Sequence, residues 1–293
     1  MAFRLLATTV MEWTPGGVSN DVEDRRGAGF RMGGIGGPHI GIGGALILLV
    51  LSLVFHRNFL ALLSGSGDDT APSSAVTQQP VTGPPDRQVQ LVSFVLDDVQ
   101  KTWETLLPQQ GRRQYRHAKL VLFQDFTDSG CGSAQSATGP FYCPTDEKVY
   151  IDLGFFNELS QRFGAPGEFA QAYVLAHEVG HHVQKLLGIE GSVSRMQQSD
   201  PSSQNRLSVG LELQADCFAG IWGHSTEQRK IVDDADIQAG LRAASSVGDD
   251  RIQRMEGRRV SPETFTHGSA AQRRAAFQKG LDSGMLSACM DVQ

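Results

Sequence analysis

The 293-residue chain contains no run of basic residues and no internal repeat. Its formal net charge is −6, and its lysine and arginine residues are spread along the sequence instead of forming the basic stripe that follows a phosphate backbone. We therefore expect no nucleic-acid partner. Cysteine is scarce as well, with four residues, and none of them has the C-x-x-C spacing that is typical of a structural zinc site.

One motif stands out against these absences. His177, Glu178 and His181 form an H-E-x-x-H sequence. An α-helix advances about 100° per residue, so side chains four residues apart lie on one face and both imidazoles can reach one zinc ion, with Glu178 beside them as catalytic base. Apolar residues recur at helical intervals from residue 168 to residue 187, before Gly188, which predicts that the motif lies inside a helix. The alternative is that the histidines merely pack on a half-buried helix face.

A catalytic zinc site normally has three protein ligands and leaves a fourth position for water. The metzincin arrangement is excluded, because it needs glycine and histidine where this chain has Gln184 and Leu187. Glu212 and Asp216 lie four residues apart in a second predicted helix with apolar neighbours. We predict that Glu212 is the third ligand and that Asp216 accepts the free N–H of a ligand histidine. Taken alone, this spacing also fits a solvated helix face.

His182 directly follows the second histidine of the motif. It lies about 140° around the helix from His177, so we expect a surface residue or a residue behind the ligands, not a ligand itself.

Further segments along the chain add to the motif: Met11–Trp13, Asp21–Gly27, a glycine-rich apolar stretch, Cys131 with Gly132, Phe141–Pro144, Tyr150–Asp152, His177–Gln184, Glu212–Cys217 and Thr266–Gly268. In this order they resemble the bacterial membrane-anchored neutral zinc metallopeptidases. The likeness begins at Met11, so residues 1–10 are either an upstream start artefact or an unstructured extension.

This resemblance implies a gluzincin-like metallopeptidase with zinc as cofactor, but it supplies no substrate. By likeness to gluzincin-type sites, His267 is the first choice for the residue that stabilises the oxyanion, with Tyr150 or Tyr142 as alternatives. A surface histidine that caps a loop is the other interpretation of His267.

The N-terminal third contains one long apolar segment. Residues 32–55 carry no charge apart from a possible charge on His39, and about 20 residues suffice to span a bilayer. We predict one transmembrane helix at 34–55; a cleaved signal peptide and a buried core helix are the alternatives. Glycines at four-residue spacing, the first at Gly33, are a weak signal for self-association.

Basic residues around this segment predict its orientation. Arg25, Arg26 and Arg31 precede it and Arg57 alone follows, which places residues 1–33 in the cytoplasm and the rest of the chain outside. The predicted location is therefore the cytoplasmic (inner) membrane, as a single-pass protein with an extracytoplasmic catalytic domain. Residues 56–87 are rich in small and polar residues and predict a disordered linker.

The zinc metallopeptidase domain is expected at 88–293, with an α+β, zincin-like fold. An amphipathic helix at 89–106 precedes strands at 119–126 and 148–153, and helical patterns follow residue 155. Zincins align the substrate backbone on an edge strand, and residues 150–152, with Tyr150 as substrate-binding residue, are the candidate. An interior strand is equally compatible with this segment.

The four cysteines predict disulfides if the domain is extracytoplasmic. Cys131 with Cys143 would close the loop between the strands, and Cys217 with Cys289 would attach the C-terminal tail to the helix of Glu212. Four cysteines allow three pairings in principle, and four free thiols are the alternative.

The predicted function is hydrolysis of a peptide or protein substrate by zinc-activated water, with Glu178 as general base, most simply as an endopeptidase. The alternative is a zinc-stabilised, non-catalytic interaction module of an envelope complex. The intact Glu178 favours the enzyme, because a structural zinc site needs no base.

Overall fold

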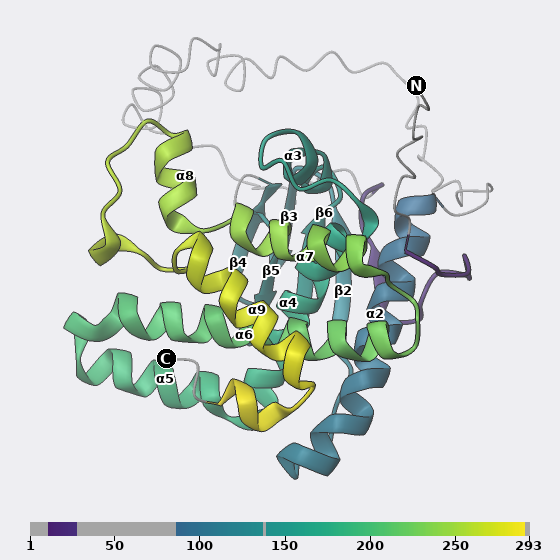
Figure 1. The fold of residues 1–293 in the computed structure, drawn as a ribbon, viewed down its shortest axis with the longest axis horizontal. Coiled ribbons are helices and arrows are strands. Elements are labelled where there is room, and N and C mark those ends of the chain that lie inside the picture. Colours follow the sequence, from purple (N-terminus) through teal and green to yellow (C-terminus); the bar gives the residue numbers. More distant parts are fainter. Residues whose placement is uncertain (1–10, 28–85, 137–138, 291–293) are drawn as a thin grey trace, which may run out of the picture. The chain divides into compact units, whose positions relative to one another are not determined.

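The computed structural model describes residues 11–27, 86–136 and 139–290 (Figure 1). All described residues belong to one compact unit. The predicted membrane span at 34–55, the glycine spacing from Gly33 and the linker up to residue 85 lie outside the described residues.

The core of the unit is a four-stranded mixed sheet in the order β1-β2-β6-β5. The first three strands are parallel and β5 is antiparallel to β6. The strands are β1 (Val22–Asp24), β2 (Lys119–Phe123), β5 (Phe141–Cys143) and β6 (Lys148–Asp152). A separate hairpin consists of β3 (Phe126–Ser129) and β4 (Gly132–Gln135), and beyond residue 126 the sequence predicted only a loop there.

Successive side chains of this sheet point to opposite faces, and each face belongs to a different apolar cluster. Leu120, Leu122, Val149 and Ile151 belong to the main core together with the helices, whereas Val121, Phe123, Cys143 and Tyr150 form a smaller cluster with Phe141. This alternation follows from the two-residue period of a strand. The face with the main core is the one that meets the metal-site helix.

Helices make up most of the chain after β6, as predicted, and the α+β fold class is confirmed (Figure 1). The helices are α2 (Arg87–Leu106), α3 (Phe155–Gln161), α4 (Glu168–Leu187), α5 (Ile189–Ser199), α6 (Gln204–Gln228), α7 (Asp234–Ser246), α8 (Asp249–Met255) and α9 (Ala270–Ser283). In Figure 1 the yellow α9 crosses the green α6. Glycine permits this close crossing, because a Cβ atom on Gly280 would lie 1.9 Å from the carbonyl oxygen of Cys217.

The N-terminal segment is an integral part of this unit. Met11 is 1% exposed in the main core, and the indole of Trp13 donates a hydrogen bond of 2.9 Å to Glu168 at the start of α4. Strand β1 extends the sheet by pairing with β2. The predicted division between a separate segment at 1–33 and a domain that begins at residue 88 is therefore wrong for residues 11–27.

The predicted membrane topology requires correction as well. A single span at 34–55 would place β1 and β2 on opposite sides of a bilayer, whereas they are neighbours in one sheet. Among the described residues, no helix is both long enough and apolar enough to cross a membrane. The pairing of β1 with β2 overturns the predicted inner-membrane, single-pass location.

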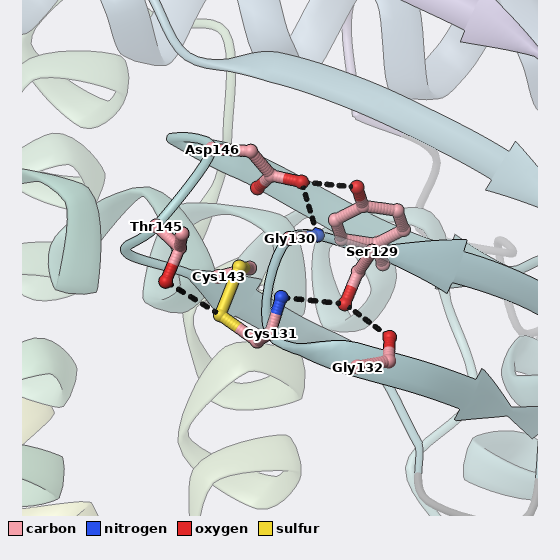
Figure 2. Close-up of a disulfide and its surroundings, with 8 residues drawn as sticks. Ser129, Gly130, Cys131, Gly132, Cys143, Thr145 and Asp146 are labelled. Carbon is pink, nitrogen blue, oxygen red and sulfur yellow. Dashed lines mark hydrogen bonds between the residues drawn. A yellow bond between two sulfur atoms is a disulfide. The ribbon is translucent and has the colours of Figure 1, made fainter.

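Both predicted disulfides are present. Cys131 and Cys143 have Cα atoms 5.8 Å apart, and Cys217 and Cys289 have Cα atoms 5.6 Å apart. Figure 2 shows the first bridge, which joins the turn of the β3–β4 hairpin to β5. The second bridge attaches the C-terminal 3₁₀ turn, Leu286–Cys289, to α6.

Candidate metal centre

Helices α4 and α6 bring three potential metal ligands together. The Nε2 atom of His177 lies 3.2 Å from one carboxylate oxygen of Glu212, and the Nε2 atom of His181 lies 3.4 Å from the other. One ligand atom from each residue can be chosen so that all three lie within 4.8 Å of one another. Among the described residues this is the one group of histidine, cysteine, aspartate or glutamate side chains with such spacing.

Gly180, inside the H-E-x-x-H motif, permits this close approach of the two helices. A Cβ atom at this position would lie 2.9 Å from the backbone oxygen of Ala215, a contact that real Cβ atoms essentially never make. Glycine is unfavourable inside a helix by roughly 1 kcal/mol relative to alanine. In this protein the glycine lets α6 approach α4 so closely that Glu212, one turn before Asp216, lies opposite the two histidines.

Each ligand histidine has its Nδ1 atom engaged. The Nδ1 of His177 lies 2.8 Å from Asp216, and the Nδ1 of His181 lies 2.9 Å from the side-chain oxygen of Gln184. Both partners accept hydrogen bonds, so both Nδ1 atoms carry the proton and both Nε2 lone pairs are directed at the space beside Glu212. Gln184 is itself fixed, because its amide donates to the carbonyl of Leu211 at 2.7 Å.

A buried arginine from α9 completes the surroundings of Asp216. Arg273 is 4% exposed, and its Nε and Nη2 atoms donate to the two carboxylate oxygens at 2.8 and 3.0 Å. The hydroxyl of Tyr173 donates to the same carboxylate. Asp216 therefore accepts a hydrogen bond from His177, while Tyr173 of α4 and Arg273 of α9 fix the position of its carboxylate.

The charge of the site favours a divalent cation. Three carboxylates, those of Glu178, Glu212 and Asp216, face one guanidinium, that of Arg273, so negative charges outnumber positive ones by two when both histidines are neutral and all three carboxylates are ionised. Burial lowers the pKa of His177, but the charge of Asp216 and its hydrogen bond outweigh burial and raise that pKa to about 10. Two imidazoles with one carboxylate are a donor set that suits zinc.

These residues line a cleft of about 560 Å³. Glu178 lies in it and is 7% exposed, and burial raises the pKa of its carboxyl group. His267 lines the same cleft from the loop before α9, with its Nδ1 atom 3.1 Å from Asp249. Backbone N–H groups of residues 266–268 also donate to Asp249, which orders this loop.

A sequence model of the protein family described as "Putative neutral zinc metallopeptidase" matches residues 11–292. The chain belongs to this family. The uncharacterized protein YpfJ of Escherichia coli K12 is 42% identical over 285 residues, which cover 95% of this chain and 98% of that protein. The uncharacterized protein Rv2575 of Mycobacterium tuberculosis H37Rv is 43% identical over 204 residues, which cover 66% of this chain and 67% of that protein. No solved structure gave a significant match.

Membership of the zinc metallopeptidase family implies a metal, and the His177, His181 and Glu212 group fits one. The predicted residues are thus brought together: both histidines, Glu178, Glu212 and Asp216. The role of each in binding or catalysis remains a prediction, as does that of His267. Three residues around the ligands were not predicted for the site: Tyr173, Gln184 and Arg273. Gln184 entered only in excluding the metzincins and in the resemblance, and nothing in the local sequence around Arg273 indicates that it reaches Asp216.

Tyr150 is not at the site. Its side chain is 1% exposed, its hydroxyl donates to Asp146 at 2.6 Å, and its ring stacks on Phe141 in the smaller cluster of the sheet. Strand β6 lies between β2 and β5, so the interior alternative holds and the predicted edge strand at residues 150–152 is wrong. Among the described strands of this sheet, β1 and β5 are the two edges, and Phe141 and Tyr142 of β5 line the cleft.

Proposed function

We propose that this member of the zinc metallopeptidase family is a zinc-dependent peptidase that cleaves extended polypeptide segments. One observation carries the proposal: His177, His181 and Glu212 converge in the same cleft as the buried carboxyl group of Glu178. A structural zinc site needs neither an open cleft nor a carboxylate beside the ligands.

Zinc held by these three side chains would lower the pKa of a coordinated water toward about 7 and polarise the scissile carbonyl. Glu178 accepts a proton as the water oxygen forms its bond to the carbonyl carbon. The same carboxyl group then gives this proton to the amide nitrogen as the C–N bond breaks. A raised pKa suits this double role, because the group must both take up and release a proton near neutral pH.

His267 is the proposed stabiliser of the oxyanion that forms on the carbonyl. Its hydrogen bond to Asp249 raises its pKa, which favours the protonated ring with a donor at Nε2. Its side chain is 51% exposed, so it can reorient toward a substrate. An imidazolium in this position resembles the donors that stabilise tetrahedral intermediates in other acyl-transfer enzymes.

Strand β5 is the proposed alignment surface for the substrate. Within the described part of the chain it has one sheet neighbour, β6, and two of its three residues line the cleft. A peptide in extended conformation can pair with such an edge through main-chain hydrogen bonds. This mode of binding suits an endopeptidase, because it does not require a chain terminus.

Part of the cleft lining is apolar. Val174 lies one turn before His177 on α4, and four further apolar side chains line the cleft: Phe155, Phe163, Val247 and Ile252. We propose that a large apolar side chain next to the scissile bond binds there, because burial of such a side chain contributes roughly 1.5–3 kcal/mol.

The test uses the full chain loaded with zinc and a peptide mixture whose cleavage products are mapped by mass spectrometry. Wild type should cleave next to large apolar residues. Glu178→Gln should lower kcat by roughly 100- to 10,000-fold, the contribution of a general base, while it retains one zinc per chain. Glu227→Gln, at an exposed position of α6, is the matched control and should leave kcat unchanged.

If zinc-loaded wild type cleaves no peptide, or if Glu178→Gln cleaves at the wild-type rate, the peptidase proposal fails. The first of these results would favour a non-catalytic zinc-stabilised module.

A further inference from the structure

His182 is a buried titratable residue that the proposed chemistry does not use. It is 0% exposed although it follows the ligand His181 directly, so the expectation of a surface position is wrong. Its Nε2 atom lies 2.6 Å from the backbone oxygen of Arg116, and its Nδ1 atom lies 2.9 Å from the hydroxyl oxygen of Tyr142. The ring of Tyr115 meets it edge-on, with centroids 5.6 Å apart.

The partners determine the direction of both hydrogen bonds. A backbone carbonyl only accepts, so Nε2 carries the proton and donates to Arg116. Both partners are uncharged, and an imidazolium in this buried place would lack a counter-charge, so the ring is neutral. The Nδ1 atom therefore accepts, and the hydroxyl of Tyr142 donates its only proton to His182. Tyr142 then has no proton left for an oxyanion, which removes the reason to assign it that role.

Tyr142 is the central residue of β5, the edge strand of the cleft. Its neighbours on the strand, Phe141 and Cys143, belong to the opposite face of the sheet, where Cys143 is joined to the β3–β4 hairpin (Figure 2). On the face toward α4, the bond between Tyr142 and His182 is a direct side-chain link from the strand to the helix that carries both ligand histidines.

We propose that His182 is a positioning residue: through the hydroxyl of Tyr142 it fixes the substrate-aligning edge of β5 at a set distance from the metal ligands. This inference rests on the proposed peptidase function. A strand of three residues has few hydrogen bonds of its own to define its position. One turn of α4 therefore supplies a metal ligand, His181, and the anchor of the substrate edge, His182.

Loss of this link should weaken substrate binding equally in the ground state and the transition state. Such a change raises KM and leaves kcat nearly unchanged. We expect His182→Phe, which retains a ring and removes both bonds, to raise KM for a peptide cleaved by wild type by roughly three- to tenfold, the value of one neutral hydrogen bond. Tyr142→Phe should have the same effect, and the double variant should be no worse than either single variant.

Two conservative variants separate the two bonds of His182. The amide oxygen of His182→Asn can occupy the place of Nδ1 and accept from Tyr142, whereas the amide of His182→Gln reaches only toward Arg116. We expect His182→Asn to recover most of the wild-type KM and His182→Gln to resemble His182→Phe. The zinc content of every variant should equal that of wild type.

Hydrogen exchange of the β5 amides gives a readout that does not depend on activity. Exchange should be about three- to tenfold faster in His182→Phe and in Tyr142→Phe than in wild type, and His182→Asn should be close to wild type. If no peptide is cleaved, the peptidase proposal fails and this exchange pattern still decides whether His182 positions β5. Unchanged exchange, loss of zinc from His182→Phe, or a fall in kcat with unchanged KM in Tyr142→Phe would overturn the proposal.

Discussion

The Arg273–Asp216 pair and the Arg26–Asp24 pair have the same bonding pattern in opposite surroundings. In each, the Nε and Nη2 atoms of the arginine donate to both oxygens of one carboxylate, at 2.8 and 3.0 Å in the first pair and at 2.9 and 2.7 Å in the second. The side chains of the first pair are 5% and 0% exposed, whereas those of the second are 28% and 38% exposed.

The surroundings decide what each pair does. Around β1, further ion pairs such as Lys119–Asp21 and Lys148–Glu23 remain in contact with water, which can replace any partner that is lost. Around Asp216, the other partners are the buried side chains of His177 and Tyr173. A buried charge that loses its partner there has no replacement. The Arg273–Asp216 pair therefore fixes the position of both side chains, whereas the Arg26–Asp24 pair contributes little to the position of its side chains.

The largest predicted difference comes from removing each arginine. Arg273→Met should lower the free energy of unfolding of the metal-free full chain by about 3–5 kcal/mol, because it leaves buried carboxylates without compensation. Arg26→Met, the matched control, should cost at most about 1 kcal/mol. Urea unfolding of both variants and wild type measures this directly, and equal losses would show that burial does not separate the two pairs.

The aspartates sharpen the same comparison through metal binding. Asp216→Asn should weaken zinc binding about 10- to 100-fold, because the amide keeps the shape of the side chain but removes the charge that polarises His177. Asp24→Asn should leave zinc affinity unchanged. Competition with a chromophoric chelator measures both. Equal zinc affinity in Asp216→Asn and wild type would mean that Asp216 does not support His177.

The smallest predicted effect is a pH dependence in the exposed network. His117 lies 2.5 Å from Asp21 and 2.7 Å from Glu104, and attaches the N-terminal segment to α2. Burial lowers its pKa, but hydrogen bonds to these two carboxylates outweigh burial and raise it above 6.5. The protonated ring thus stabilises the folded state fully below pH 6.5, and this contribution is lost as pH rises through the raised pKa.

His117→Gln should accordingly cost at most about 1 kcal/mol near pH 6, because the side chain is 43% exposed, and less near pH 9. Urea midpoints of wild type and variant at the two pH values test this. A difference between them that grows with pH would contradict the assigned direction of the pKa shift.

Local patterns were sufficient for much of the candidate site. The helix at 168–187 was predicted with its bounds, since apolar periodicity and the glycine after it are properties of neighbouring residues. Glu212 was selected because a second apolar helix with acidic residues needs a cation nearby, and the structure brings it to His177 and His181. Both cysteine pairings are present as well, although their prediction rested on the even cysteine count and on the extracytoplasmic location, not on a local pattern.

Other features have no local signal. Strand β1 contains two acidic residues among its three and does not have the alternating pattern of a strand. It forms because the edge of β2 is open and because the Lys119 amine pairs with Asp21, 98 positions away. The predicted boundary at residue 88 therefore excluded a part of the domain, and the predicted topology across a membrane failed with it.

The sequence by itself determined the fold class, the helix of His177, Glu178 and His181, and the kind of metal that these residues suit, because helix period and ligand chemistry depend on nearby residues. Only the tertiary structure decided that β5 forms the edge of the cleft, that Arg273 holds Asp216, and that His182 is buried against Tyr142. Each of these depends on which distant segments become neighbours. Burial and the loss of water set the strength of such contacts, and neither is a property of one segment alone.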